Sequence, residues 1–192
     1  MKLYNKKIKY HTCAITGWDG ETCYESPDTY LLLCDNKGNV KINHTKEETI
    51  KLCDNHIVEI DSMLNHGIWD NVYLVLTLSI GGGIGYILPR IIDQYLIKYN
   101  KERGIIPHIY VVCAINSFKT DISDERTKEM LDILNKYVEE DKIELVVVDA
   151  TDIKESLKGK GVGLVEYFDQ VDDIVCNKVN EVIEGIEKNN EC

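Results

Sequence analysis

The sequence feature that most constrains the fold of this chain is the apolar run at residues 72–89, VYLVLTLSIGGGIGYILP. The run is rich in β-branched side chains and then changes to glycine at Gly81, Gly82, Gly83 and Gly85. It predicts a buried strand followed by a tight turn and a helix. Glycine lets backbone N–H groups approach an anion, and a helix N-terminus adds positive partial charge. The run therefore predicts a phosphate-binding loop, with a turn that binds nothing as the alternative.

Predicted strands and helices alternate along most of the chain. Apolar residues at helical spacing predict helices, and short apolar runs predict buried strands. The helices are expected over 49–64, 89–100, 124–138 and 164–186, and the strands over 72–78, 109–115 and 143–148. This alternation implies βαβ units, so we expect a three-layer α/β domain of Rossmann-like type with a mostly parallel sheet. Ligands of such sheets bind beyond the carboxyl ends of the strands, where the glycine run falls.

Length, charge and cysteine content limit the classes of protein to consider. A chain of 192 residues is expected to form a single domain over 1–192, with 1–45 as a divergent N-terminal part and 46–192 as the core. The net charge of −11 argues against nucleic acid as a partner. No apolar stretch is long enough for a membrane span, and the first residues lack a signal-peptide pattern. We therefore expect a cytoplasmic protein whose seven cysteines are reduced.

The order of four segments within 48–186 resembles the nucleotide-binding domain of FtsZ and tubulin. The helix and strand IVEIDSMLNHGIWDNVYLVLTLS lead into GGGIG at 81–85, which resembles the family's GGGTGTG signature. The strand HIYVVCAINSF at 108–118 is similar to the strand that follows the signature helix. The segment LVEYFDQVDDIVCNKVNEVIEGI at 164–186 is similar to the family's long central helix. TYLLLCDN at 29–36 looks like the second strand and its loop.

The resemblance implies a bound GTP or GDP, with or without Mg²⁺, and it suggests two further site residues. Asp173 falls at the position of the guanine-reading aspartate, whose carboxylate accepts from the N1–H and the exocyclic amine of guanine. Arg126 falls where the family often has an arginine that contacts phosphate. Asp149 is a candidate on its own pattern, because it ends a predicted strand at the ligand-binding edge. Each of these residues also has a purely structural interpretation. Asp173 can belong to a solvated helix face, Arg126 to a charged helix start and Asp149 to a helix cap.

Several positions depart from the family pattern. The two threonines of the signature are Ile84 and Tyr86 here, and its last glycine is Ile87. The N-terminal glycine loop is replaced by ITGWDGE at 15–21. The chain ends soon after the helix at 164–186, so we expect it to lack the second domain that completes the GTPase site of a neighbouring subunit. The expected role is regulatory or partner-binding, through self-association or a filament-forming protein, and turnover of the nucleotide is left open.

Two other functions remain open at this point. The segments LSIGGGIGYI at 78–87 and IELVVVDATDI at 143–153 also resemble motifs of S-adenosylmethionine-dependent methyltransferases, although Ser79 replaces the acid of the first motif. A non-catalytic scaffold is the other alternative, with Tyr86 and Ile87 filling a former phosphate pocket. No metal site is expected. Cys53 and His56 lie one helical turn apart, and His11, Cys13 and Cys23 are the other candidates, but no second close pair completes a set of four ligands.

Overall fold

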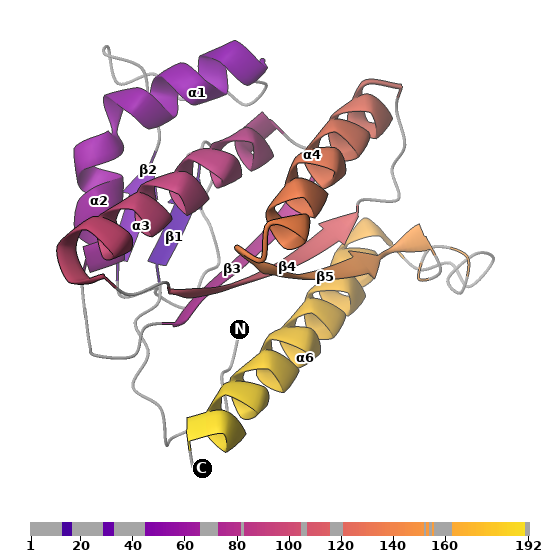
Figure 1. Cartoon of the computed structure of the whole chain (residues 1–192). Coiled ribbons are helices and arrows are strands. Elements are labelled where there is room, and N and C mark those ends of the chain that lie inside the picture. Colours follow the sequence, from indigo (N-terminus) through magenta and orange to yellow (C-terminus); the bar gives the residue numbers. More distant parts are fainter. Residues whose placement is uncertain are drawn as a thin grey trace. The chain divides into compact units, whose positions relative to one another are not determined.

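The structure is a computed structural model of the whole chain, and it describes residues 13–16, 29–32, 45–65, 73–81, 83–104, 107–115, 121–151, 153, 155 and 163–190 (Figure 1). The described elements form two compact units. The sheet unit contains the strand before the glycine turn and the described elements from residue 108 onward. The helix unit contains the described elements before residue 66 and the segment 83–104. A single domain over 1–192 stays a prediction.

Three parallel strands form the centre of the sheet unit. They are β3 (Tyr73–Ile80), β4 (His108–Ile115) and β5 (Glu144–Asp149), in the same order in the sheet as in the chain. The central strand β4 is the most deeply buried, as expected for a parallel sheet that is covered on both faces. The sequence prediction of an α/β fold with a parallel sheet is therefore confirmed.

Helices α4 (Asp121–Glu139) and α6 (Leu164–Asn190) lie on opposite faces of this sheet (Figure 1). Each helix buries one apolar stripe, which in α4 includes Met130 and Leu134. The stripe of α6 includes Tyr167, Val171, Val179 and Ile186. Within the sheet unit the arrangement is helix, sheet and helix, so this unit has three layers.

The long helix α6 runs antiparallel to the strands. Near its start, Tyr167 and Val171 pack with Ala114 of β4 and with Ala150 and Ile153, which follow β5. Its last turns lie beside the first residues of β4 and β5. The helix therefore extends from the carboxyl edge of the sheet, where the strands end, to the amino edge, where they begin.

The helix unit contains a second, smaller sheet and helices on either side of the glycine run in sequence. Strands β1 (Cys13–Thr16) and β2 (Thr29–Leu32) form a parallel pair, in register from Cys13 and Thr29. The helical elements are α1 (Lys46–Asn55), α2 (Ile57–Asn65), the 3-10 helix η1 (Gly83–Ile87) and α3 (Leu88–Arg103). Pro89 lies in the first turn of α3, as the sequence predicts.

The single helix expected over 49–64 is wrong, because the structure has two helices there. Helix α1 begins with a capping box, in which the Thr45 hydroxyl accepts from the Glu48 N–H at 3.2 Å and the Glu48 carboxylate accepts from the Thr45 N–H at 3.0 Å. It ends at His56, whose N–H donates to the carbonyls of Leu52 and Cys53. The break follows Asp and Asn residues of low helix propensity, which apolar periodicity alone does not register.

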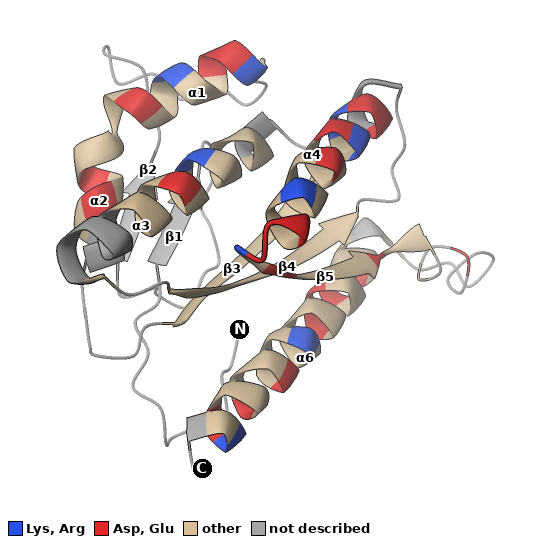
Figure 2. Ribbon diagram, in the orientation of Figure 1, with Lys and Arg blue, Asp and Glu red and all other residues tan. Residues whose placement is uncertain are grey.

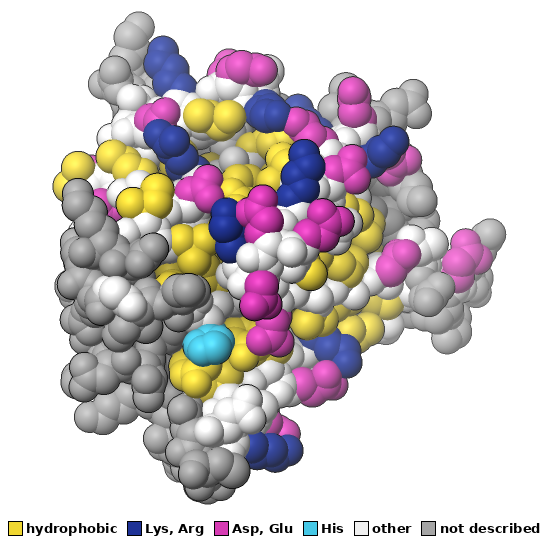
Figure 3. Space-filling model, viewed as in Figure 1, with side chains coloured by type: hydrophobic (Ala, Val, Ile, Leu, Met, Phe, Trp, Pro, Cys, Tyr) yellow, Lys and Arg dark blue, Asp and Glu magenta, His cyan; other side chains and the backbone are white. Residues whose placement is uncertain are grey.

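Charged residues are frequent on the described helices. Acidic residues recur along α4 and α6, where they outnumber the basic ones (Figure 2). Side chains of both charges are interspersed with apolar ones on the face seen in Figure 3. Among the described residues, no helix is long and apolar enough to cross a membrane.

Candidate functional site

The carboxyl edge of the sheet unit carries the first part of the glycine run. Ile80, Ile115 and Asp149 are aligned across the ends of β3, β4 and β5. Gly81 follows β3 directly and has a φ of 98°, in the region that favours glycine. Gly81 and Asp149 therefore lie at the same edge, separated by two strand spacings of about 4.8 Å each.

The rest of the glycine run belongs to the helix unit. Gly83 and Gly85 lie in η1, which continues into α3, and Gly82 lies outside the described residues. The order along the chain is thus strand, glycine turn and helix. Tyr86 and Ile87 are only 8% and 5% exposed, and the Lys46 ammonium lies 5.6 Å from the centroid of the Tyr86 ring. These two side chains pack into the interior of the helix unit, at the positions where the FtsZ and tubulin signature has threonine and glycine.

Asp149 has an exposed side chain that already takes part in a local turn. Its Oδ1 accepts a hydrogen bond of 2.8 Å from the N–H of Thr151. The N–H of Ala150, between these two residues, donates to the carbonyl of Ile115 at 3.3 Å. The carboxylate is therefore held at the edge by a turn of the type that aspartate commonly forms.

Arg126 and Asp173 lie on the two helices that cover the sheet. Arg126 is half-buried in the second turn of α4, a helix that begins at the carboxyl edge because it follows β4. Asp173 is exposed on α6, two residues after the buried Val171 and hence on the far side of the helix from the sheet. The structure thus brings Gly81 and Asp149 to one edge, places Arg126 near that edge and turns Asp173 away from the sheet.

Asp172, which precedes Asp173 and is not among the predicted site residues, is partly desolvated by the protein. Burial raises its pKa, and the negative charges of Asp169 and Asp173 raise it further. No sequence signal separates it from Asp173, because both acids lie in the same short acidic stretch.

Cys53, Cys113 and Cys176 are free thiols. Burial raises the pKa of both Cys53 and Cys113 to about 11, and it also raises the pKa of Cys176. Within the described ranges, no three His, Cys, Asp or Glu residues come close enough to hold a metal ion. The buried thiols are therefore part of the packed interior.

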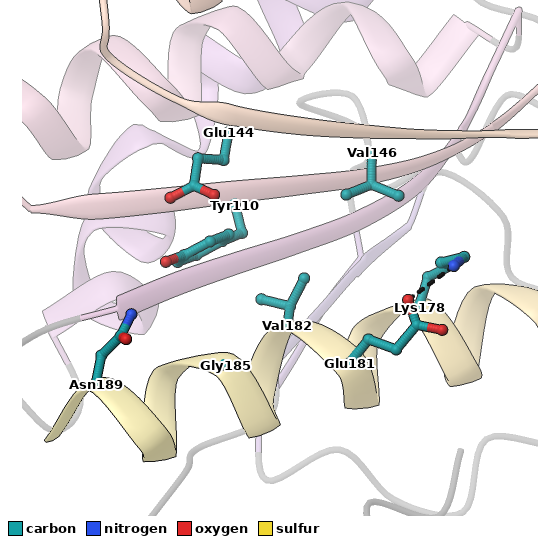
Figure 4. Close-up of a pocket in the computed structure, with 8 residues that line it drawn as sticks. All are labelled: Tyr110, Glu144, Val146, Lys178, Glu181, Val182, Gly185 and Asn189. Atoms are coloured by element: carbon teal, nitrogen blue, oxygen red, sulfur yellow. Dashed lines mark hydrogen bonds and ion pairs between the residues drawn. The ribbon is translucent and has the colours of Figure 1, made fainter. Parts of the chain in front are cut away.

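A groove at the amino edge of the sheet unit is a second candidate site, which sequence reasoning missed. Its volume is about 430 Å³, and eight residues line it (Figure 4). They come from β4, β5 and α6: Tyr110, Glu144, Val146, Lys178, Glu181, Val182, Gly185 and Asn189. The only sequence signal is Gly185, a glycine within an otherwise uninterrupted helical pattern.

The polar groups of the groove lie at its two ends, with valines between them (Figure 4). At one end Glu144 forms a hydrogen bond with Tyr110. Burial raises the pKa of Tyr110, and the charge and hydrogen bond of Glu144 raise it further. At the other end, the Lys178 ammonium forms an ion pair of 2.7 Å with Glu181. The groove therefore has a polar end, an apolar centre and an end where the charges are paired.

A well-defined turn sets the position of Glu144. Helix α4 ends with the N–H of Lys142 donating to the carbonyl of Tyr137 at 2.9 Å and that of Asp141 donating to Val138 at 3.0 Å. Asp141 has a φ of 55°, and this pattern is a Schellman motif. The motif ends α4 just before β5 begins at Glu144, so the acid is placed by regular structure on both sides.

No known family model matches this chain, and no curated protein matches it in sequence. Its class is therefore defined by fold and geometry. The chain is an α/β protein with a parallel three-stranded sheet, a glycine turn at the carboxyl edge and a polar groove at the amino edge.

Proposed function

We propose that this chain binds a guanine nucleotide, GTP or GDP, at the carboxyl edge of the sheet unit. In this proposal it acts as a regulatory or partner-binding relative of FtsZ and tubulin and not as a stand-alone GTPase. The observation that carries the proposal is the position of Gly81. It follows a parallel strand directly, at the edge where α/β sheets bind ligands, with a φ that favours glycine.

The order of elements also supports the proposal. In the resemblance, the signature loop is followed by its helix, a strand and later the long central helix. The sheet order β3, β4, β5 and the long helix α6 after it are compatible with that sequence of elements. Asp149 adds a carboxylate at the same edge, which could hold Mg²⁺ or a ribose hydroxyl.

Asp173 sets a geometric condition on guanine recognition. Its side chain is exposed and points away from the sheet, so a base that it reads has to lie along the outer side of α6. Arg126, in the second turn of α4, supplies positive charge for the phosphates in this proposal. A site with this geometry selects guanine over adenine through one carboxylate that accepts two hydrogen bonds.

Titration calorimetry of the full chain against GTP, GDP, ATP and S-adenosylmethionine, each with Mg²⁺, tests the proposal. We expect GTP or GDP to bind and ATP to bind more weakly. Asp173→Ala should weaken GTP binding at least about tenfold, since a hydrogen bond to a charged group contributes about 1.5–3 kcal/mol. The matched control is Glu184→Ala, which removes an exposed acid from the same side of α6 three turns later.

Two outcomes of the same titrations would contradict the guanine-nucleotide proposal. Equal affinity of Asp173→Ala and the unmodified chain for GTP would remove the guanine assignment. Binding of S-adenosylmethionine in place of GTP would favour the methyltransferase alternative.

One observation favours a second candidate, a scaffold without a nucleotide. Tyr86 and Ile87 are buried, so the hydroxyl donor and the glycine of the family's loop are replaced by packed side chains. We propose a scaffold role if none of the four ligands gives heat at millimolar concentration. Any saturable binding of a nucleotide to the unmodified chain contradicts this second candidate.

A further inference from the structure

We propose that the groove at the amino edge of the sheet unit binds a small organic amine in its ammonium form, with Glu144 as the counter-charge. This site is separate from the proposed nucleotide site, since the two lie at opposite edges of the same sheet. The inference rests on the size of the groove, the open space over Gly185 and the balance of charge between its ends.

The size of the groove suits a small molecule. Its volume of about 430 Å³ lies within the range of small-ligand sites, and Val146 and Val182 supply apolar surface at its centre. A Cβ placed on Gly185 would meet no other atom within 4 Å, so the missing side chain leaves open space. Glycine destabilises the interior of a helix, and here its effect on shape is to widen the groove.

The charges in the groove favour a cation. Lys178 is paired with Glu181 at one end, so those two charges compensate each other. Among the described residues, Glu144 takes part in no ion pair, and the group beside it is the neutral Tyr110 hydroxyl. An ammonium placed at Glu144 would therefore meet an uncompensated carboxylate, whereas a carboxylate ligand would be repelled.

The Tyr110 ring, which lies next to Glu144, adds to this preference, and it belongs to a small aromatic cluster. The Tyr73 ring stacks on His108, with centroids 5.2 Å apart, and lies 6.5 Å from the Tyr110 ring. Tyrosine faces attract cations through their quadrupole. The Asn189 amide lies at the same end of the groove as the Tyr110 hydroxyl (Figure 4), so it can accept a further N–H of the ammonium.

These contacts define the ligand by its chemistry. The ammonium lies against the Glu144 carboxylate, the Tyr110 hydroxyl and the Asn189 amide. A short aliphatic chain crosses Val146 and Val182 above Gly185 and ends beside the Lys178–Glu181 pair. The ligand class is therefore an amine on a short apolar chain.

The experiment compares three probes of the same length with the full chain: hexylamine, hexanol and hexanoate. Binding is followed by protein NMR at about pH 7, where the amine is charged, and in about 0.15 M salt, which screens distant charges. We expect hexylamine to bind at least about tenfold more tightly than hexanol, because only the amine forms a charge-assisted hydrogen bond. Hexanoate should bind more weakly still. Shifted resonances should include those of Gly185 and Val146.

Three variants test the assignment of the residues. Glu144→Gln keeps the shape and removes the charge, and it should weaken hexylamine binding at least about tenfold. Gly185→Leu fills the open space, and it should abolish binding of all three probes. The control Glu184→Gln removes an equal charge at the position just before Gly185 on α6, outside the groove, and it should leave the affinity for hexylamine unchanged. A thermal unfolding scan of each variant shows that it is folded.

The proposal is overturned if hexylamine does not bind at millimolar concentration. It is also overturned if hexanoate binds as tightly as hexylamine, or if Glu144→Gln keeps full affinity while folded. Equal weakening by Glu184→Gln would mean that the amine is attracted to the net negative charge of the chain and not to this groove.

Discussion

The two edges of the three-stranded sheet present their polar groups in different ways. At the carboxyl edge, the polar atoms belong to turns, and the Asp149 carboxylate is engaged by the Thr151 N–H. At the amino edge, Tyr110, Glu144 and Lys178 project from the interiors or ends of regular strands and a helix. A turn can offer backbone N–H groups to an anion, whereas regular elements hold side chains in fixed directions. One sheet can therefore present a backbone-based site at one edge and a side-chain-based site at the other.

The largest predicted effect on stability comes from removing the packing that holds the start of α6 at the carboxyl edge of the sheet. Tyr167 is 4% exposed and packs with Ala114, Ala150 and Val171 near the carboxyl edge. Tyr167→Ala should lower the free energy of unfolding by about 3–5 kcal/mol, measured by urea denaturation. Phe168→Ala, at the more exposed neighbouring position, is the control and should cost roughly 1 kcal/mol. Equal losses at the two positions would show that the start of α6 is not anchored by Tyr167.

The second prediction concerns Cys113, which lies in β4 between the two edges. Its pKa of about 11, against an ordinary value of 9.0, should reduce the thiolate fraction at about pH 8 roughly 100-fold, and burial should slow alkylation further. The raised pKa favours the neutral thiol of the folded state. Its contribution to stability is therefore complete below about pH 9 and is lost as the pH rises through about 11. Iodoacetamide labelling with peptide mapping should show Cys176 reacting before Cys113, and equal rates at these two cysteines would contradict the burial of Cys113.

The third prediction concerns the substitution of Gly81 at the carboxyl edge by alanine, which adds a single methyl group. Gly81 has a φ of 98°, which L side chains rarely adopt. Gly81→Ala should therefore destabilise the protein by about 1–3 kcal/mol, measured by chemical denaturation. An unchanged denaturation midpoint would mean that the turn relaxes to another conformation without cost.

The smallest predicted effect is the same substitution at the amino edge, with the opposite sign. Gly185 is helical and a Cβ there meets no atom within 4 Å. Gly185→Ala should stabilise the protein by about 0.5–1 kcal/mol, because alanine restricts the unfolded chain and favours the helix. If both glycine variants shift stability in the same direction, the contrast between a strained turn and a regular helix is lost.

The sequence predicted the strands and most helices because their signals are local. Apolar runs and helical periodicity located β3, β4, β5, α4 and α6 within a few residues. The break at His56 was missed, since it depends on the propensities of a few polar residues inside an apolar pattern.

The two candidate sites also differ in whether their residues are close together in the sequence. Gly81 could be found because its neighbours in space are also its neighbours in sequence. The groove unites Tyr110, Glu144 and the segment 178–189, and no spacing rule connects them. The side of α6 on which Asp173 lies likewise depends on how that helix packs, which the acidic stretch alone does not specify.

The path of the chain between the units has a consequence for biosynthesis. Strand β3 belongs to the sheet unit, but η1 and α3 of the helix unit are synthesised before its partner β4. At about 5–20 residues per second, translation of residues 83–107 takes roughly one to five seconds, during which the apolar strand β3 lacks β4, its partner among the described strands. We expect the nascent chain to need protection in this interval. Protease digestion of released chains that end at residue 107 and at residue 192 should cleave β3 in the first and spare it in the second.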